Sequence, residues 1–211
     1  MSLRSNATVG ISLLYGTIIV VAVVWVFLTG RPSLFMYPGA EPATLPELAP
    51  DRMLVMALLG IAAGAVVSTA SLLLSRHVRW FGLLDSFFVN LIGGFSAGEL
   101  ILMVLLGSVA EELFFRGAMQ PSLGLVVQAL VFAAMHTGPR RLFFFLLPWT
   151  VMAFGTGLFF GWMFMYTGCL LAPITAHLTV NTMGIVRMRI RMRRGDIPAM
   201  DEILEQFEGK N

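Results

Sequence analysis

The sequence predicts an all-α fold, a polytopic bundle of about six membrane-spanning helices with one short helix at the membrane interface. Of its 211 residues, 57% are hydrophobic and only 12% are charged. Soluble domains carry about 25% charged residues. A soluble domain of this length could not bury so much apolar surface, because much of the surface of a small domain stays in contact with water. Apolar runs long enough to cross a bilayer recur along the chain, and arginines flank them. The length therefore allows one membrane domain and no second soluble domain.

Crossing the hydrocarbon core takes roughly 20 apolar residues as helix. The first such run covers residues 8–29. It is longer than the core of a signal peptide and lacks a small-residue cleavage site, so we expect an uncleaved span. A loop broken by five prolines follows at residues 31–52. The second span covers residues 53–75, where Gly60 and Gly64 are spaced to let another helix approach closely.

The next segment, residues 80–95, predicts a short interfacial helix because Asp85 and Asn90 interrupt its apolar residues. Four more spans follow, at residues 97–119, 123–136, 142–166 and 170–186. The fourth of the six is short, so it either tilts little or ends inside the protein. Gly157 and Gly161 repeat the close-approach spacing on the fifth.

We divide the chain into three parts. Residues 1–96 hold two spans, the proline-rich loop and the interfacial segment. Residues 97–187 form a helix core that carries the candidate site, and residues 188–211 form a basic tail. Near its end, residues 201–207 predict one or two amphipathic turns without an assigned function.

Basic residues set the orientation, because cytoplasmic loops carry an excess of arginine and lysine. With the N-terminus inside, the outer segments hold Arg31 and Arg52, diluted by acidic neighbours. The cytoplasmic segments then hold Arg4, Arg76, Arg79, Arg140, Arg141, Arg187, Arg189, Arg191, Arg193 and Arg194. We expect a cell-membrane protein with both termini in the cytoplasm. The run of arginines at 187–194 directly follows a span, which predicts an anchor on anionic lipid rather than a nucleic-acid site.

Glu111, Glu112 and Arg116 lie inside the third span, where each charge costs about 2.5–3.5 kcal/mol. Glu112 and Arg116 are four residues apart with the acid first, the favourable order for a pair along one helix face. This pair either fixes helix packing or supports a site. Glu111 lies about 100° round the helix and is left over. An unpaired buried carboxylate is a candidate general base, because desolvation favours its protonated form.

Two histidines also fall within spans. His136 closes the fourth span, and His177 lies in the sixth with Asn181 one turn later on the same face. A single intramembrane histidine is as often a helix contact as a functional group. Together, carboxylate, imidazole and amide groups suit amide hydrolysis. The carboxylate and one imidazole can hold and deprotonate a water. The other imidazole and the amide N–H can stabilise the tetrahedral oxyanion. His77, in a basic loop, is most simply a solvated residue.

Three motifs occur in order along this part of the chain: EELFFR at residues 111–116, FAAMH at 132–136 and HLTVN at 177–181. They match EExxxR, FxxxH and HxxxN, and on them residues 97–186 resemble the CPBP (CAAX protease and bacteriocin-processing, or Abi) family of intramembrane glutamic endopeptidases. The resemblance implies a helix bundle with a site inside the membrane.

The roles that the resemblance implies can be placed residue by residue. Glu111 and His136 would activate water, and His177 with Asn181 would form the oxyanion hole. The supporting pair would be Glu112 and Arg116. One feature departs from the family pattern: only 25 residues separate Glu111 from His136. On ideal helices these two residues would lie about 13 Å and 20 Å from the outer turn, so a tilt or a break near Pro121 must close the gap.

Other catalytic mechanisms have less support in the sequence. No HExxH or GxGD motif is present, Ser108 is most simply a helix contact, and Cys169, the single cysteine, has no histidine near it in sequence. We expect no cofactor, although zinc stays an alternative because Glu111, His136 and His177 are residue types that ligate it.

The expected activity is cleavage of a membrane-anchored protein or peptide, as C-terminal processing or leader removal. The partners would then be that substrate and the lipid bilayer, with no nucleic acid, and the oligomeric state is open. Two non-protease alternatives are a membrane scaffold of the immunity type and a proton-relay transporter.

Overall fold

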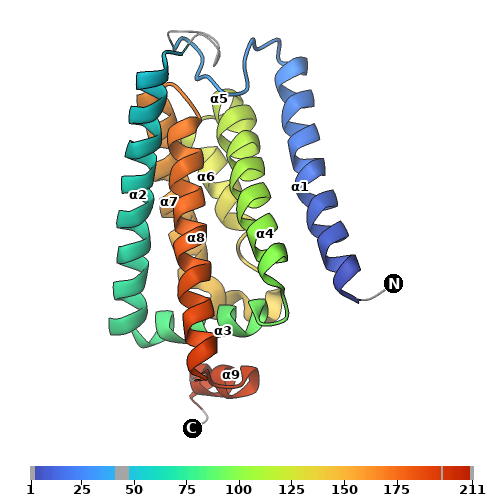
Figure 1. Cartoon of the computed structure of the whole chain (residues 1–211), viewed down its shortest axis with the longest axis vertical. Coiled ribbons are helices and arrows are strands. Elements are labelled where there is room, and N and C mark those ends of the chain that lie inside the picture. The colour runs from blue at the N-terminus through green and yellow to red at the C-terminus, as the bar shows by residue number, and fades with distance from the viewer. Residues whose placement is uncertain (1–2, 41–47, 196, 210–211) are drawn as a thin grey trace.

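The computed structural model describes residues 3–40, 48–195 and 197–209, with side chains from residue 8 onward. These residues form an all-helical bundle, which confirms the predicted fold class (Figure 1). The helices, in chain order, are α1 (Leu3–Leu28), α2 (Pro50–His77), α3 (Arg79–Ile92), α4 (Ala97–Glu111), the π-helix η2 (Glu112–Met119), α5 (Gln120–Leu123), α6 (Leu125–Ala134), the 3₁₀ turn η3 (Arg140–Leu142), α7 (Phe143–Thr167), α8 (Leu171–Arg194) and α9 (Met200–Glu208).

Within the described residues, three helical segments are long and apolar enough to cross a membrane: Thr8–Leu28, Pro50–His77 and Arg140–Thr167. A fourth candidate consists of α3 followed by α4 to α5, with a bend of 116° between the two parts. The chain is therefore a multi-pass membrane protein. The number of six spans stays a prediction, because α8 is long enough but carries arginines in its second half.

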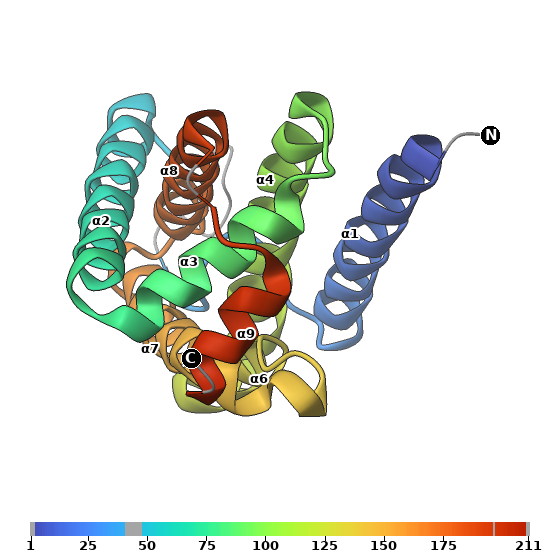
Figure 2. The ribbon, with the colours of Figure 1, turned by 90° about the horizontal axis from the view of Figure 1, so that it is seen from below.

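The bend explains the predicted interfacial helix. α3 crosses the end of the bundle, while α4, η2 and α5 continue along its length as the third predicted span (Figures 1 and 2). Ser96 begins α4 with a capping box, in which its hydroxyl accepts from the backbone N–H of Glu99 and the Glu99 carboxylate accepts from the backbone N–H of Ser96. The two helices are thus separated by a specific helix start and not by a gradual curve.

The fourth predicted span ends inside the protein. α6 has 10 residues, which gives a length of about 15 Å, or half the hydrocarbon core. Gly124 sets its start, with a backbone φ of +86° that residues with a Cβ rarely adopt. His136 therefore lies two residues after the end of α6.

Both pairs of spaced glycines are at close helix contacts, as predicted. A Cβ on Gly64 would strike the backbone oxygen of Ala176 on α8, and Gly60 makes the same kind of contact one turn away. On α7, the carbonyls of Gly157 and Gly161 accept hydrogen bonds from the side chains of two buried glutamines on α5 and α6, at 2.9 Å each. The small residues thus bring α2 against α8, and α7 against α5 and α6.

The predicted loop covers one end of the bundle. Tyr37 N–H donates to the Gly168 carbonyl at 2.9 Å, and Leu170 N–H donates to the Phe35 carbonyl at 2.8 Å. The loop is therefore tied to the turn between α7 and α8. Pro42 and Pro46, two of the prolines that predict this loop, lie outside the described residues.

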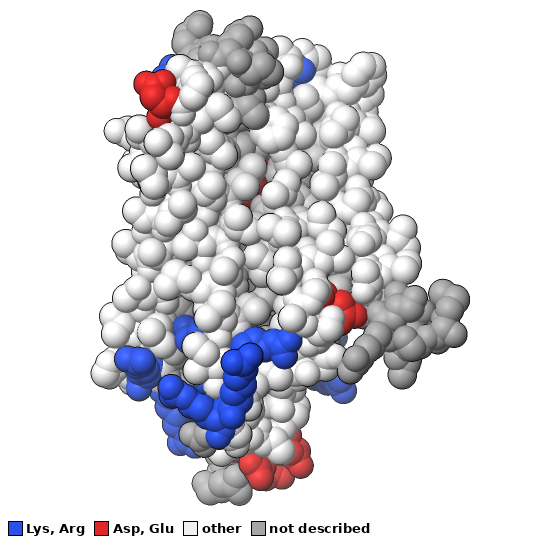
Figure 3. All heavy atoms as spheres, viewed as in Figure 1, with Lys and Arg blue, Asp and Glu red and all other residues white. Residues whose placement is uncertain are grey.

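The opposite end gathers the arginines (Figure 3). Two members of the 187–194 run have a protein partner that the sequence did not predict. Arg187 and Arg191 each contact a carboxylate oxygen of Asp85 at 2.6 Å, and Asp85 is 7% exposed. These two arginines bind α3, because the buried aspartate requires charged partners, and the role of the run as a lipid anchor stays a prediction. α9 then covers α3, with Ile203 fully buried between them.

Candidate active site

The three predicted charges lie where the third span changes its winding. α4 ends at Glu111, and the eight residues of η2 that follow are π-helical. The sequence predicted regular α-helix here, so this is a correction. A π turn is wider than an α turn and occurs often at functional sites. Arg31, from the loop between α1 and α2, donates to the Gly117 carbonyl at 2.6 Å. This bond fixes one peptide group of η2 with a side chain from another part of the chain.

The predicted pair between Glu112 and Arg116 is present. Arg116 Nη1 donates to Glu112 Oε1 at 3.0 Å, and neither side chain is exposed. The guanidinium also lies 4.5 Å from the centroid of the Phe132 ring, within range of a cation–π contact. What the spacing did not show is a third partner: His177 Nδ1 lies 2.8 Å from the same oxygen of Glu112. Glu112 thus holds an arginine on its own helix and a histidine on α8.

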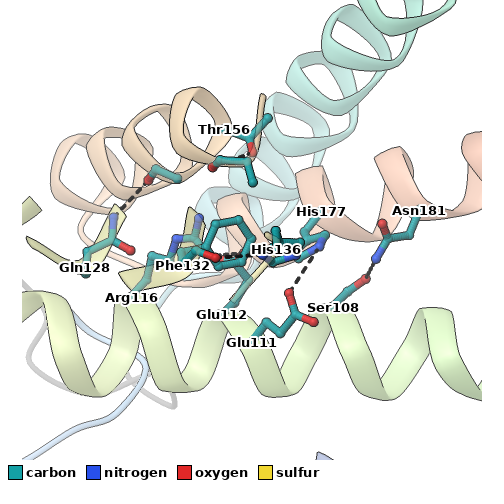
Figure 4. A network of polar contacts seen from close by, with 12 residues as sticks. Ser108, Glu111, Glu112, Arg116, Gln128, Phe132, His136, Thr156, His177 and Asn181 are labelled. Atoms are coloured by element: carbon teal, nitrogen blue, oxygen red, sulfur yellow. Dashed lines mark hydrogen bonds and ion pairs between the residues drawn. The ribbon is translucent and has the colours of Figure 1, made fainter. Parts of the chain in front are cut away.

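Glu111 points differently, as the 100° rotation predicted. Its side chain is 19% exposed, and its Oε2 atom lies 3.9 Å from His177 Nε2. The two ring nitrogens of His177 therefore face two different carboxylates (Figure 4). On the space-filling surface, acidic atoms are visible in a narrow recess halfway along one face (Figure 3). Glu111 is the more accessible of the two adjacent acids.

Asn181 lies one helical turn beyond His177 and also faces α4. Its Nδ2 atom donates to the hydroxyl oxygen of Ser108 at 3.0 Å, and Ser108 is fully buried (Figure 4). Ser108 is thus a helix contact, as expected, but its partner is a candidate site residue. α4 and α8 are therefore linked twice at this level, through Ser108 with Asn181 and through Glu111 with His177.

His136 is near this group but not bonded to it. Its Nδ1 atom lies 2.7 Å from the carbonyl oxygen of Phe132. A carbonyl only accepts, so Nδ1 carries the hydrogen and Nε2 keeps its lone pair. The Phe132 ring lies between the two histidines, with centroids 4.4 Å from His136 and 6.4 Å from His177. Within the described chain, His136 forms no hydrogen bond or ion pair with Glu111, so the predicted pair is not in direct contact.

The geometry bears on the zinc alternative. Across the part of the chain that the structure describes, no three His, Cys, Asp or Glu side chains gather closely enough to hold a metal ion. Glu111, His136 and His177 do not form a ready metal cage in this arrangement. Cys169 lies in the turn between α7 and α8, where burial raises the pKa of its thiol above the ordinary range. A raised pKa leaves less thiolate, which disfavours a nucleophilic role.

Two further residues near the site were missed by sequence reasoning. Ser108 was weighed only as packing. Tyr15 on α1 was not considered, yet a Cβ added to Gly107 would lie 2.9 Å from its hydroxyl oxygen. That places the Tyr15 hydroxyl against α4, one turn before Glu111. No local signal distinguishes Tyr15 within the apolar first span. Ser108 could have been noted, because it lies four residues before Glu112 and shares its helix face.

Comparison with known proteins agrees with the motifs. Residues 93–183 match the family described as "Type II CAAX prenyl endopeptidase Rce1-like". A relative in Bacillus subtilis (strain 168), "Uncharacterized protein YpbD", is 34% identical over 118 residues. That match covers 55% of this chain and 58% of the relative, so the chain spans little more than half of that protein's length. No solved structure matches the chain.

The matched segment contains every motif from which the resemblance was inferred. It begins just before α4 and ends just after Asn181, so it includes both carboxylates, both histidines and the asparagine. The description of that family, a CAAX prenyl endopeptidase, is consistent with the CPBP family that the motifs resemble. Over residues 93–183, which make up less than half of its 211 residues, this chain is similar to the Rce1-like type II CAAX prenyl endopeptidase family.

Proposed function

We propose that the chain is an intramembrane endopeptidase that hydrolyses a peptide bond in a membrane-anchored protein or peptide. The observation that carries the proposal is the contrast between two adjacent carboxylates. Glu112 is fully buried and bonded to Arg116 and His177, whereas Glu111 is 19% exposed and approaches His177 at 3.9 Å, beyond hydrogen-bond distance. One acid therefore holds the site together, and the other is available to react.

In this proposal Glu111 is the general base. Its carboxylate takes a proton from a water as the water oxygen attacks the carbonyl carbon of the substrate. His136 helps to hold that water, because its Nε2 lone pair accepts a hydrogen bond while Nδ1–H is fixed on the Phe132 carbonyl. The two side chains need not touch, since the water between them is the reacting group. The proton on Glu111 then passes to the leaving amine nitrogen as the C–N bond breaks.

The opposite side of the reacting carbonyl would face α8. The donors proposed for the tetrahedral oxyanion are His177 Nε2–H, in the doubly protonated ring whose Nδ1–H is held by Glu112, and the second N–H of Asn181. Glu112 supports this role, because its bond to Nδ1 fixes the orientation of the imidazole ring. One lost oxyanion donor typically lowers the rate by about 10²–10³-fold and leaves the nucleophile in place. Asn181→Ala should therefore keep a small residual activity, whereas Glu111→Ala and His136→Ala should abolish cleavage.

We propose that the site uses no cofactor and that both termini lie in the cytoplasm. The first point rests on the Glu111 and His136 pair, which can activate water without a metal. The second rests on the arginines, which gather at the end of the bundle where α2 and α8 finish (Figure 3). Zinc would bind only if His136 moved toward Glu111 and His177. The activity of the purified protein should therefore survive strong chelators. If chelation removes the activity and zinc restores it, Glu111, His136 and His177 are zinc ligands and not acid–base groups.

The test uses purified protein in liposomes with a farnesylated peptide that ends in a CAAX sequence, the substrate class in the family description. Mass spectrometry should detect release of the last three residues by the wild type and none by Glu111→Ala. A proteomic comparison of cells with and without the gene would extend the search to peptide leaders and C-terminal sorting tails. If neither assay finds a cleaved bond that depends on Glu111, the scaffold and proton-relay alternatives replace the protease.

A further inference from the structure

Ser108 lies outside the three motifs and yet contacts the site directly. It is on α4, three residues before Glu111 and four before Glu112, and its side chain is fully buried. The hydroxyl oxygen accepts a hydrogen bond from Asn181 Nδ2 at 3.0 Å. This bond crosses from the helix that carries the proposed base to the helix that carries the proposed oxyanion donors.

We propose that Ser108 is a positioning residue that fixes the Asn181 carboxamide for oxyanion binding. This inference rests on the proposed function. A carboxamide has two N–H donors, and the bond to Ser108 uses one and leaves the other for substrate. The terminal torsion of asparagine is soft and has broad minima. Without a partner the amide would rotate, and water cannot replace the hydroxyl because Ser108 is fully buried.

The behaviour of other hydroxyls in this protein separates the proposal from simple packing. Hydroxyls within helices commonly donate back to the carbonyl four residues earlier. Thr17, Thr69 and Ser86 do so here, at 2.8, 2.8 and 3.1 Å. Ser108 makes no such bond to Val104 among the described residues and accepts from α8 instead. The Ser108 hydroxyl differs from these three in that its hydrogen-bond partner lies on another helix.

The kinetic test measures kcat and KM on the farnesylated CAAX peptide in liposomes. Ser108→Ala should lower kcat about 3–10-fold with little change in KM, which is the worth of one neutral hydrogen bond. Ser108→Thr keeps the hydroxyl and should restore most of the rate. In the Asn181→Ala background, Ser108→Ala should add nothing, because both changes remove the same contact. Ser68→Ala is the matched control, since Ser68 is also buried and its hydroxyl has no partner among the described residues.

A second readout does not depend on activity. With ¹⁵N-asparagine labelling, four side-chain amides are present, those of Asn6, Asn90, Asn181 and Asn211. The Asn181 signal, identified by its loss in Asn181→Ala, should shift in Ser108→Ala and stay in place in Ser68→Ala.

The outcomes distinguish the two proposals. If the wild type cleaves the peptide but Ser108→Ala keeps its full kcat, or if the two substitutions are additive, the role of Ser108 is refuted and the protease remains. If the wild type does not cleave this peptide, the proposed substrate class fails. The amide signal then still decides the contact: an unshifted signal in Ser108→Ala refutes it.

Discussion

Replacement of Arg116 by methionine should be among the most destabilising single changes in this protein. The change keeps an unbranched side chain but removes the guanidinium, which leaves the Glu112 carboxylate as a buried charge without its 3.0 Å partner. Both side chains are 0% exposed, so solvent screening does not soften the loss. Breaking a buried pair by removing one partner costs about 3–5 kcal/mol, which corresponds to roughly 10²–10⁴-fold in the ratio of folded to unfolded protein.

Two companion variants make the comparison specific. In Glu112→Gln with Arg116→Met, no charge is left alone, so the double variant should be more stable than Arg116→Met. Glu111→Gln should cost less than about 1 kcal/mol, because that carboxylate is partly exposed and its nearest charged group lies 3.9 Å away. The free energy of unfolding would be measured by titrating detergent-solubilised protein with SDS and following the circular dichroism. The reasoning is refuted if Arg116→Met lies within about 1 kcal/mol of the wild type, or if Glu111→Gln is the less stable variant.

Three further predictions concern the scaffold. Reporter domains fused after Tyr37 and after Arg194 should report the outer and cytoplasmic sides, and the reverse result would contradict the proposed orientation. Gly64→Leu should reduce the amount of folded protein, because overpacking the contact between α2 and α8 costs about 1–3 kcal/mol. Gly16→Leu is the control and should be tolerated, because a Cβ there meets open space. Equal losses of folded protein in the two variants would refute the contact. Asp85→Asn removes the negative charge and one of the two acceptor oxygens that bind Arg187 and Arg191. Charged hydrogen bonds are worth about 1.5–3 kcal/mol each, so hydrogen exchange should accelerate in α3. Unchanged exchange would show that this ion pair does not hold the helix.

Much of the fold was predictable because it depends on local spacing. The apolar runs fixed where helices form, and the interval of four residues predicted the contact between Glu112 and Arg116. The same holds for Gly60 and Gly64, since two small residues one turn apart suit a close helix approach. Each of these inferences needs only the geometry of a single helix.

The remainder depends on how separate helices meet. The contact between His177 and Glu112 joins residues 65 positions apart, and nothing in either motif shows which of the two adjacent acids the histidine faces. The π-helical winding of η2 was missed for a related reason. Its sequence is compatible with α-helix, and the bond from Arg31 to the Gly117 carbonyl is made by a loop 86 residues away.

The arginines in the second half of α8 show the same limit. A basic run beside a span is typical of a lipid anchor. Arg187 and Arg191 bind Asp85, which lies more than 100 residues earlier in the chain. Charge composition predicted the end of the bundle at which these residues lie, and only the structure could assign their partner.

The most direct test of the central claim compares two glutamates on one helix. Glu111→Gln and Glu99→Gln make the same chemical change on α4, and glutamine at residue 99 can keep the capping box that begins the helix. The rate of cleavage of the farnesylated CAAX peptide would be measured for both variants in liposomes, with equal amounts of folded protein. The proposed role of Glu111 as general base predicts loss of cleavage in Glu111→Gln and near wild-type cleavage in Glu99→Gln. Full activity in Glu111→Gln would contradict the role of this carboxylate.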